Sequence, residues 1–281
     1  MTSNPTKILP AEIWKQYSQQ IIVAIVFLLA YLPTFLWMWD RWFARDSYYS
    51  HGILIPFVTG YLIWQMKDEL AKIKPQESVW GMRWIIAGVL LYLLSSFFRI
   101  YFSSAFSMMI VFVGLILYFY GEAILKKIAF PIAFLFFMLP LPMVVITNIS
   151  FTLKLLAAQI ATFLLNHMRI PAIREGSVIK MLHSQVVVED VCSGLRSLIS
   201  LTALGSIFAF WMKGPMFKRT LLFLSTIPIA IITNVCRIMF LSFISEVWGS
   251  QYATGLVHDF SGFMVFGLAF ILLFAVAKLL E

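Results

Sequence analysis

Three reactive side chains stand out in a chain that is otherwise strongly apolar: Cys192, Arg237 and His258. Each lies at or near the end of a long apolar segment, where a polar group is costly unless it has a function. A thiol, a guanidinium and an imidazole can serve as nucleophile, oxyanion donor and proton carrier in cysteine-dependent acyl transfer. Together they predict a cysteine protease or transpeptidase built into a membrane.

The residues around Cys192 predict that its thiol lies at the start of a helix. Asp190 and Ser193 are typical N-cap residues and stand just before an apolar helical run. Unpaired backbone N–H groups at that position favour an anion and are expected to lower the thiol pKa. Arg196, one turn further on, adds positive charge on the same face. The ordinary alternative is a small buried hydrophobic residue, which these neighbours disfavour.

Arg237 lies inside the apolar run Thr233–Phe240 of an expected membrane span. An arginine at the centre of a span costs about 2.5–3.5 kcal/mol on insertion scales. A helix ending near Glu246 would leave it roughly 13 Å below that end, which snorkelling covers only in part. We therefore expect a polar cavity that Asn234, one turn earlier, shares. Cys236 should point about 100° away from Arg237, into packing.

His258 begins the last apolar segment and is followed by Asp259. Ser261 and Gly262 make one helical face below the imidazole small, which leaves space for a substrate backbone. A histidine at a membrane boundary is more often an interface residue, so this interpretation depends on a shared face with Cys192 and Arg237. His51 also starts a span on the outer side, and both lining the site and capping a helix stay open for it.

Several other kinds of site are disfavoured by the sequence. The histidines lack the His-Glu-x-x-His spacing of zinc proteases, and no phosphate loop or Gly-x-Ser-x-Gly elbow occurs. We therefore expect no metal and no cofactor. Two cysteines exclude a disulfide framework. The net charge of +8 is spread over short loops, a pattern typical of cytoplasmic loops and not of nucleic-acid binding.

Composition identifies the class of fold. The 281 residues are 61% hydrophobic and 12% charged, whereas soluble domains carry about 25% charged residues. We predict an all-α polytopic membrane protein with a single domain over residues 1–281 and a cytoplasmic segment over residues 1–20. It should have about eight transmembrane helices, over Ile21–Trp39, Gly52–Met66, Ile85–Phe102, Ala105–Tyr120, Ile128–Ile146, Leu198–Trp211, Leu221–Ser245 and Phe260–Leu280.

The positions of the basic residues predict the topology. Most lysines and arginines fall in four stretches that should be cytoplasmic: Thr2–Gln20, Lys67–Arg83, Glu122–Lys127 and Lys213–Arg219. This alternation holds only if Ile149–Met168 does not cross, so we expect it to be an amphipathic helix in the outer interface. Residues 169–191 then form an external loop, in which Ser177–Leu182 and Gln185–Asp190 predict a β-hairpin leading into Cys192.

With these residues assembled, the chain resembles the exosortase/archaeosortase family of membrane cysteine enzymes. Three ordered motifs carry the resemblance, and two shorter stretches, Ser50–Pro56 and Arg174–Glu189, are also similar. The motifs are Cys192-Ser193-Gly194-Leu195-Arg196-Ser197, Asn234-x-x-Arg237-Ile238 and His258-Asp259-Phe260-Ser261-Gly262. The similarity extends from about Asp40 to the C-terminus.

The resemblance implies residue roles and a substrate class. Cys192 would be the nucleophile, Arg237 the oxyanion-stabilising residue and His258 the proton donor and acceptor. The partners would be exported proteins with a C-terminal signal made of a short motif such as Pro-Glu-Pro, a transmembrane helix and a basic tail. Cleavage would occur on the external face of the bacterial inner membrane, in an exopolysaccharide-associated setting. Some relatives carry an extra soluble C-terminal domain, whereas this chain stops at Glu281, so we expect another protein to supply that function.

Two other functions stay open at this point. A transporter or a lipid-linked glycan-handling protein could use Arg237 and His258 to bind an anionic substrate. A scaffold for other membrane enzymes would need none of the three residues. Neither the sorting signal, the acceptor of the acyl group nor the oligomeric state follows from the sequence.

Overall fold

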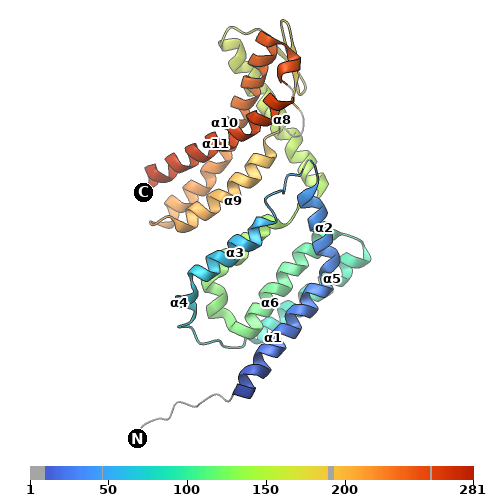
Figure 1. Ribbon diagram of the computed structural model, residues 1–281, viewed down its shortest axis with the longest axis vertical. Coiled ribbons are helices and arrows are strands. Elements are labelled where there is room, and N and C mark those ends of the chain that lie inside the picture. The colour runs from blue at the N-terminus through green and yellow to red at the C-terminus, as the bar shows by residue number, and fades with distance from the viewer. Residues whose placement is uncertain (1–9, 46, 189–192, 254) are drawn as a thin grey trace.

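The computed structural model describes residues 10–45, 47–188, 193–253 and 255–281, with the side chains of residues 10–17, 256, 258 and 259 left out of the description. The molecule is elongated and almost entirely helical (Figure 1). Its helices are α1 (Pro10–Ala30), α2 (Leu32–Phe43), α3 (Leu54–Gln65), α4 (Lys67–Leu70), α5 (Val79–Phe97), α6 (Tyr101–Lys127), α7 (Ala129–Phe134), α8 (Met143–His167), α9 (Leu195–Trp211), α10 (Met216–Trp248) and α11 (Leu256–Leu280), with 3₁₀ turns η1 (Leu135–Met138) and η3 (Ser250–Ala253). This confirms the all-α polytopic class.

The number of full-length spans differs from the eight expected. Within the described residues, five helices are long and apolar enough to cross a membrane, or six if α1 and α2, bent by 59°, form one span. Three predicted spans correspond to shorter apolar helices: α3, the α7–η1 segment and α9. A rise of about 1.5 Å per residue gives the 17-residue α9 close to 26 Å, slightly less than the hydrocarbon thickness of about 30 Å.

The segment expected to lie flat in the interface belongs to α8, which is itself long and apolar enough to span. Ala157, Ala158 and Ala161 are all buried, in one cluster with Val235 and Ile238 of α10. Small side chains let two helices approach closely along their length. Ile149–Met168 thus belongs to a helix that packs on α10 through its alanines, and its expected position in the outer interface stays a prediction.

Three of the four stretches expected to be cytoplasmic lie near one another. Lys127 forms an ion pair with Glu69, and Lys218 Nζ donates a hydrogen bond to the backbone oxygen of Glu281 at 3.5 Å. A pocket between α6–α7 and α9–α10 is lined by Lys127 and Arg219 together. The clustering agrees with the positive-inside pattern, and the orientation itself stays a prediction.

α5 and α6 pack with their backbones in near contact. A Cβ placed on Gly114 would lie 2.8 Å from the backbone nitrogen of Ile85, and one on Gly88 would lie 3.0 Å from that of Val111. Any larger residue at these positions would force the helices apart. The glycines therefore determine how closely this helical hairpin closes.

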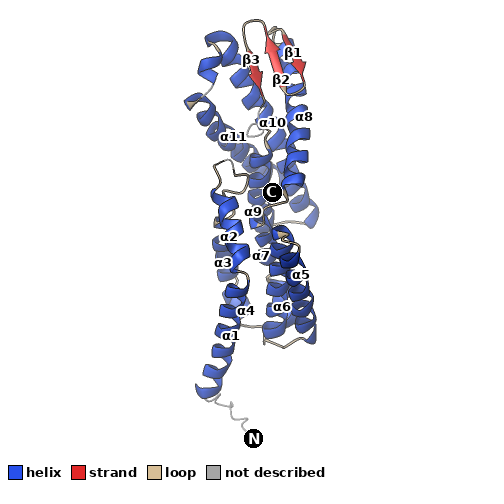
Figure 2. Cartoon of the chain, turned by 90° about the vertical axis from the view of Figure 1, so that its right-hand side faces the viewer, coloured by secondary structure: helices blue, strands red, loops and turns tan. Residues whose placement is uncertain are grey.

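The predicted external hairpin is present and has a third strand. β2 (Val178–Met181) pairs antiparallel with β3 (Gln185–Val187), as expected, and also with β1 (Ala172–Glu175), which was not predicted. The sheet lies at the end of the molecule formed by α8 and α10 (Figures 1 and 2). Ile179 of β2 is fully buried in the cluster that joins α8 to α10. The sheet is thus packed on the helices that carry the candidate site.

Candidate functional site

One turn of α10, from Asn234 to Arg237, is the meeting point of the predicted motifs. Asn234 is 2% exposed and Arg237 is 9% exposed. A guanidinium is kept in such a place only where other groups hold it. Neither Asn234 nor Arg237 is without a partner. Arg237 has a polar neighbour in Ser261, and the polar cavity expected around it stays a prediction.

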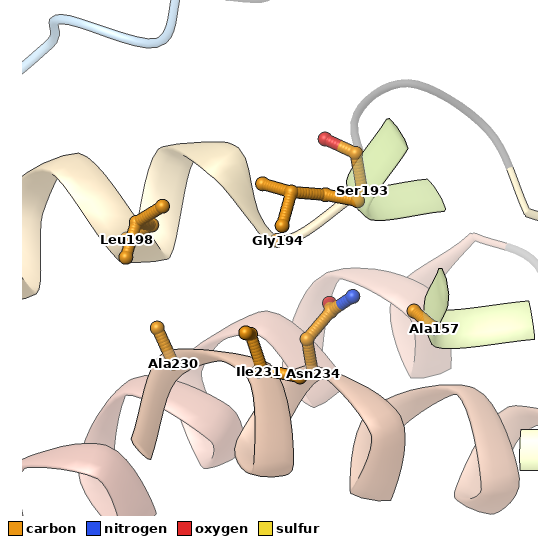
Figure 3. A pocket seen from close by; sticks show the side chains of 8 residues that line it. Ala157, Ser193, Gly194, Leu198, Ala230, Ile231 and Asn234 are labelled. Atoms are coloured by element: carbon orange, nitrogen blue, oxygen red, sulfur yellow. The ribbon is translucent and has the colours of Figure 1, made fainter. Parts of the chain in front are cut away.

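The Cys192 motif meets this turn through Gly194. Gly194 precedes α9 with φ +83°, in the left-handed region. A Cβ placed on it would lie 2.9 Å from Cγ of Asn234. Glycine satisfies both demands, because it adopts positive φ without strain and leaves room for the amide. Figure 3 shows Ser193 and Gly194 on one side and Asn234 of α10 pointing towards them from the other.

The cavity between these elements is a packing gap and not a substrate pocket. Leu198 of α9 faces Ala230 and Ile231 of α10 across it, with Ala157 of α8 at one side (Figure 3). Its volume is about 10 Å³, the space of roughly one water molecule. A peptide must therefore approach Gly194 from another side.

The His258 motif, on α11, contacts the same turn of α10. Arg237 Nε donates a hydrogen bond to Ser261 Oγ at 2.9 Å, and Ser261 is fully buried. A Cβ placed on Gly262 would lie 3.7 Å from a terminal nitrogen of Arg237. The small residues of α11 thus accommodate the guanidinium. The sequence interpretation read Ser261 only as a small residue and missed its role as a hydrogen-bond acceptor.

The three motifs are therefore adjacent in the folded chain. Gly194 contacts Asn234, and Ser261 contacts Arg237 one turn further along α10. Cys192 itself lies outside the described residues, and so do the side chains of His258 and Asp259. The backbone of His258 is in the first turn of α11, three residues before Ser261. The structure therefore shows that the three motif segments lie next to one another.

A comparison with family models gives an independent result. A model described as transmembrane exosortase (Exosortase_EpsH) matches residues 39–275, which is most of the chain and includes every motif above. The chain belongs to the transmembrane exosortase family. Comparison with curated proteins and with solved structures gave no match. Membership of the exosortase family supports a membrane protease or transpeptidase role in general terms.

His51, one of the residues within the exosortase match, lies beside α9. Its Nδ1 is 3.3 Å from Ser200 Oγ. Its Nε2 is buried and has no hydrogen-bond partner among the described residues. Burial lowers the pKa of His51 below its ordinary value of 6.5, so the neutral imidazole is favoured. Ser200 stands one turn after Arg196, so His51 borders the face of α9 that leads back towards the Cys192 motif.

Arg196 and Cys236 behave differently from Arg237. Arg196 is partly buried, and its Nε has no hydrogen-bond partner in the described part of the chain. Cys236 is an exposed free cysteine, so the expectation that it packs inside was wrong. The 100° step from the buried Arg237 turns it to the outer side of α10, where no neighbouring helix covers it. Among the described residues, no group of three His, Cys, Asp or Glu side chains could hold a metal ion.

Proposed function

We propose that this exosortase is a cysteine transpeptidase or protease that cuts C-terminal sorting signals of exported proteins on the external face of the inner membrane. The observation that carries the proposal is Arg237: a buried guanidinium held by Ser261 of the His258 motif, one turn from the contact with the Cys192 motif. Its substrates would carry a short motif such as Pro-Glu-Pro, a transmembrane helix and a basic tail.

The roles of the three residues follow from their chemistry. Cys192 passes its thiol proton to His258 as its sulfur attacks the carbonyl carbon of the scissile peptide, and the carbonyl oxygen takes up the negative charge. Arg237 donates hydrogen bonds to that oxygen, because its planar guanidinium presents several N–H groups in a fixed geometry. The C–N bond breaks as His258 gives a proton to the leaving amine, and a thioester on Cys192 remains. Water or an amine then displaces the thiol, which completes hydrolysis or transfer.

Ser261 supports this role of Arg237 by fixing the Nε side of the guanidinium. Arg237 Nε donates a hydrogen bond to Ser261 Oγ at 2.9 Å, which fixes the orientation of the guanidinium plane. An oxyanion donor contributes most when it needs no reorganisation at the moment of reaction. The hydrogen bond to Ser261 supplies such preorganisation.

The test compares the two cysteines of the chain. A reporter bearing the sorting signal is expressed with Cys192→Ser or Cys236→Ser, and both processing and membrane level are measured. We expect Cys192→Ser to abolish processing at a normal membrane level, and Cys236→Ser to process normally. Full processing by Cys192→Ser would exclude a thiolate nucleophile and favour a transporter or glycan-handling protein, in which the thiol is dispensable.

A further inference from the structure

The two edges of the external sheet are not equivalent, and the strand register determines what each edge presents. Met181 N donates to Ser184 O, and Val188 N donates to Ser177 O. In an antiparallel pair the bonded residues alternate, so Val186 faces β2 with its backbone groups while those of Gln185 and Val187 point outwards. On β1 the same rule turns the backbone groups of Ala172 and Arg174 outwards, given the pairing of Ala172 with Met181.

The β1 edge is closed by a side chain at Ala172. Asn166 Nδ2 donates to Ala172 O at 2.8 Å, and Ala172 N donates to Asn166 Oδ1 at 2.9 Å. The amide therefore takes the place of a neighbouring strand at this position. Figure 2 shows β1 on the side of the sheet next to α8, which carries Asn166. Proteins commonly blunt an edge strand in this way, since a free edge invites another chain to pair.

The β3 edge is open. No hydrogen bond engages the outward backbone groups of Gln185 and Val187 within the described residues. Both residues are exposed, Val187 at 52%. Together they present two N–H donors and two C=O acceptors in the spacing of a strand. Within the described residues, the sheet thus has one edge that a side chain caps at Ala172 and one edge that no side chain caps.

The open edge is anchored beside the candidate site. Val188, which directly follows β3, is buried in the same cluster as Val235 and Ile238, the residues that flank Arg237 on α10. Cys192 lies four positions after Val188 in the sequence. At the other end of β3, Ser184 Oγ donates to a carboxylate oxygen of Glu246 at 2.7 Å, and His183 N donates to both oxygens of that carboxylate. The strand is therefore held on α10 at both ends.

We propose that an extended segment of the substrate binds as a fourth strand along the free edge of β3, with the backbone of Gln185 and Val187 as its partners. This inference rests on the proposed function and assigns the place where the sorting segment binds. Main-chain pairing of this kind supplies affinity with little demand on sequence, and pockets for alternate side chains supply the selection. It also presents the peptide extended, as a nucleophile needs it. The occupant is a peptide backbone, because only a backbone offers donors and acceptors at this spacing.

The test removes an outward N–H from the open edge of β3. Val187→Pro removes an outward donor and puts a ring on the open edge, while the bonds of Val186 and Val188 to β2 stay intact. Arg174→Pro is the matched control, because it removes an outward N–H from the opposite edge of the same sheet. We expect Val187→Pro to lower reporter processing at least tenfold and Arg174→Pro to change it less than twofold, at equal membrane levels. Equal processing by the two variants would overturn the proposal.

A second measurement keeps the result independent of folding and of catalysis. In a chain carrying Cys192→Ala and Cys236→Ala, Gln185→Cys is oxidatively cross-linked to reporters with single cysteines at successive positions of the sorting segment. A substrate strand should cross-link with a period of two, since alternate side chains lie on the same face. A uniform pattern, or none, contradicts strand pairing. Processing that survives Cys192→Ala would instead refute the proposed function, so the two failures are distinguishable.

Discussion

Gly194→Ala offers a test of how the Cys192 motif is seated on α10. An alanine at φ +83° is strained by about 1–2 kcal/mol, because Cβ meets the backbone in the left-handed region. Its Cβ would also lie 2.9 Å from Asn234 Cγ, and such overpacking typically costs about 1–3 kcal/mol. The sum predicts a loss of roughly 2–5 kcal/mol in the free energy of unfolding.

Gly176→Ala is the matched control. Gly176 has φ +63°, but an added Cβ there meets nothing within 4 Å. Only the strain of about 1–2 kcal/mol applies. Unfolding of both variants in mixed micelles of mild detergent and SDS measures the difference, and the reporter measures processing. Gly194→Ala should lose more stability and nearly all processing, whereas Gly176→Ala keeps most of both. Equal losses would show that Asn234 does not press against Gly194, and the arrangement of the site would be wrong.

Three further predictions follow from other parts of the structure. Arg237→Lys should lower processing about 10²–10³-fold, the usual effect of a lost oxyanion donor. Arg196→Lys should lower processing less, because a point charge near the thiol suffices. If Arg196→Lys lost more processing than Arg237→Lys, the two roles would be exchanged. A cysteine at His183 should react with an impermeant maleimide in intact cells and one at Lys218 should not, and the opposite labelling would place the site in the wrong compartment. Burial lowers the pKa of His51, so its neutral form stabilises the fold above pH ~6.5, and that contribution is lost as the pH falls through the lowered pKa. His51→Gln should therefore flatten the decline in thermal stability between about pH 7 and pH 5. An unchanged stability profile would contradict this.

The polar surroundings of Arg237 could be predicted from residue chemistry and order. Arg237 in an apolar run signalled a polar environment because charge is costly there, and the structure places it against Ser261. The sequence could not show which residue binds Arg237. In a single sequence, a serine that accepts a hydrogen bond cannot be distinguished from a serine that is present for its small size. The same holds for Ser200, whose contact with His51 joins residues 149 positions apart.

The fold was predicted in class and less well in its details. Hydropathy locates apolar segments, but it does not distinguish a short helix such as α3 from a full span when loops contribute apolar residues at both ends. The prediction for α8 used the charges of the loops and took no account of how the helix packs against α10. The alanines of α8 pack against α10, a contact that neither hydropathy nor loop charge reveals. β1 escaped prediction because a four-residue strand with one buried residue has little pattern to detect.

The near contact of α5 and α6 bears on how the protein is made. The contact depends on glycines within one hairpin, so it needs no residue downstream of Lys127 and can form while the ribosome is still translating α8. Arg237 and Ser261, by contrast, can be joined only once α11 has been synthesised. The α5–α6 hairpin can therefore close before the contact that holds the guanidinium of Arg237 exists.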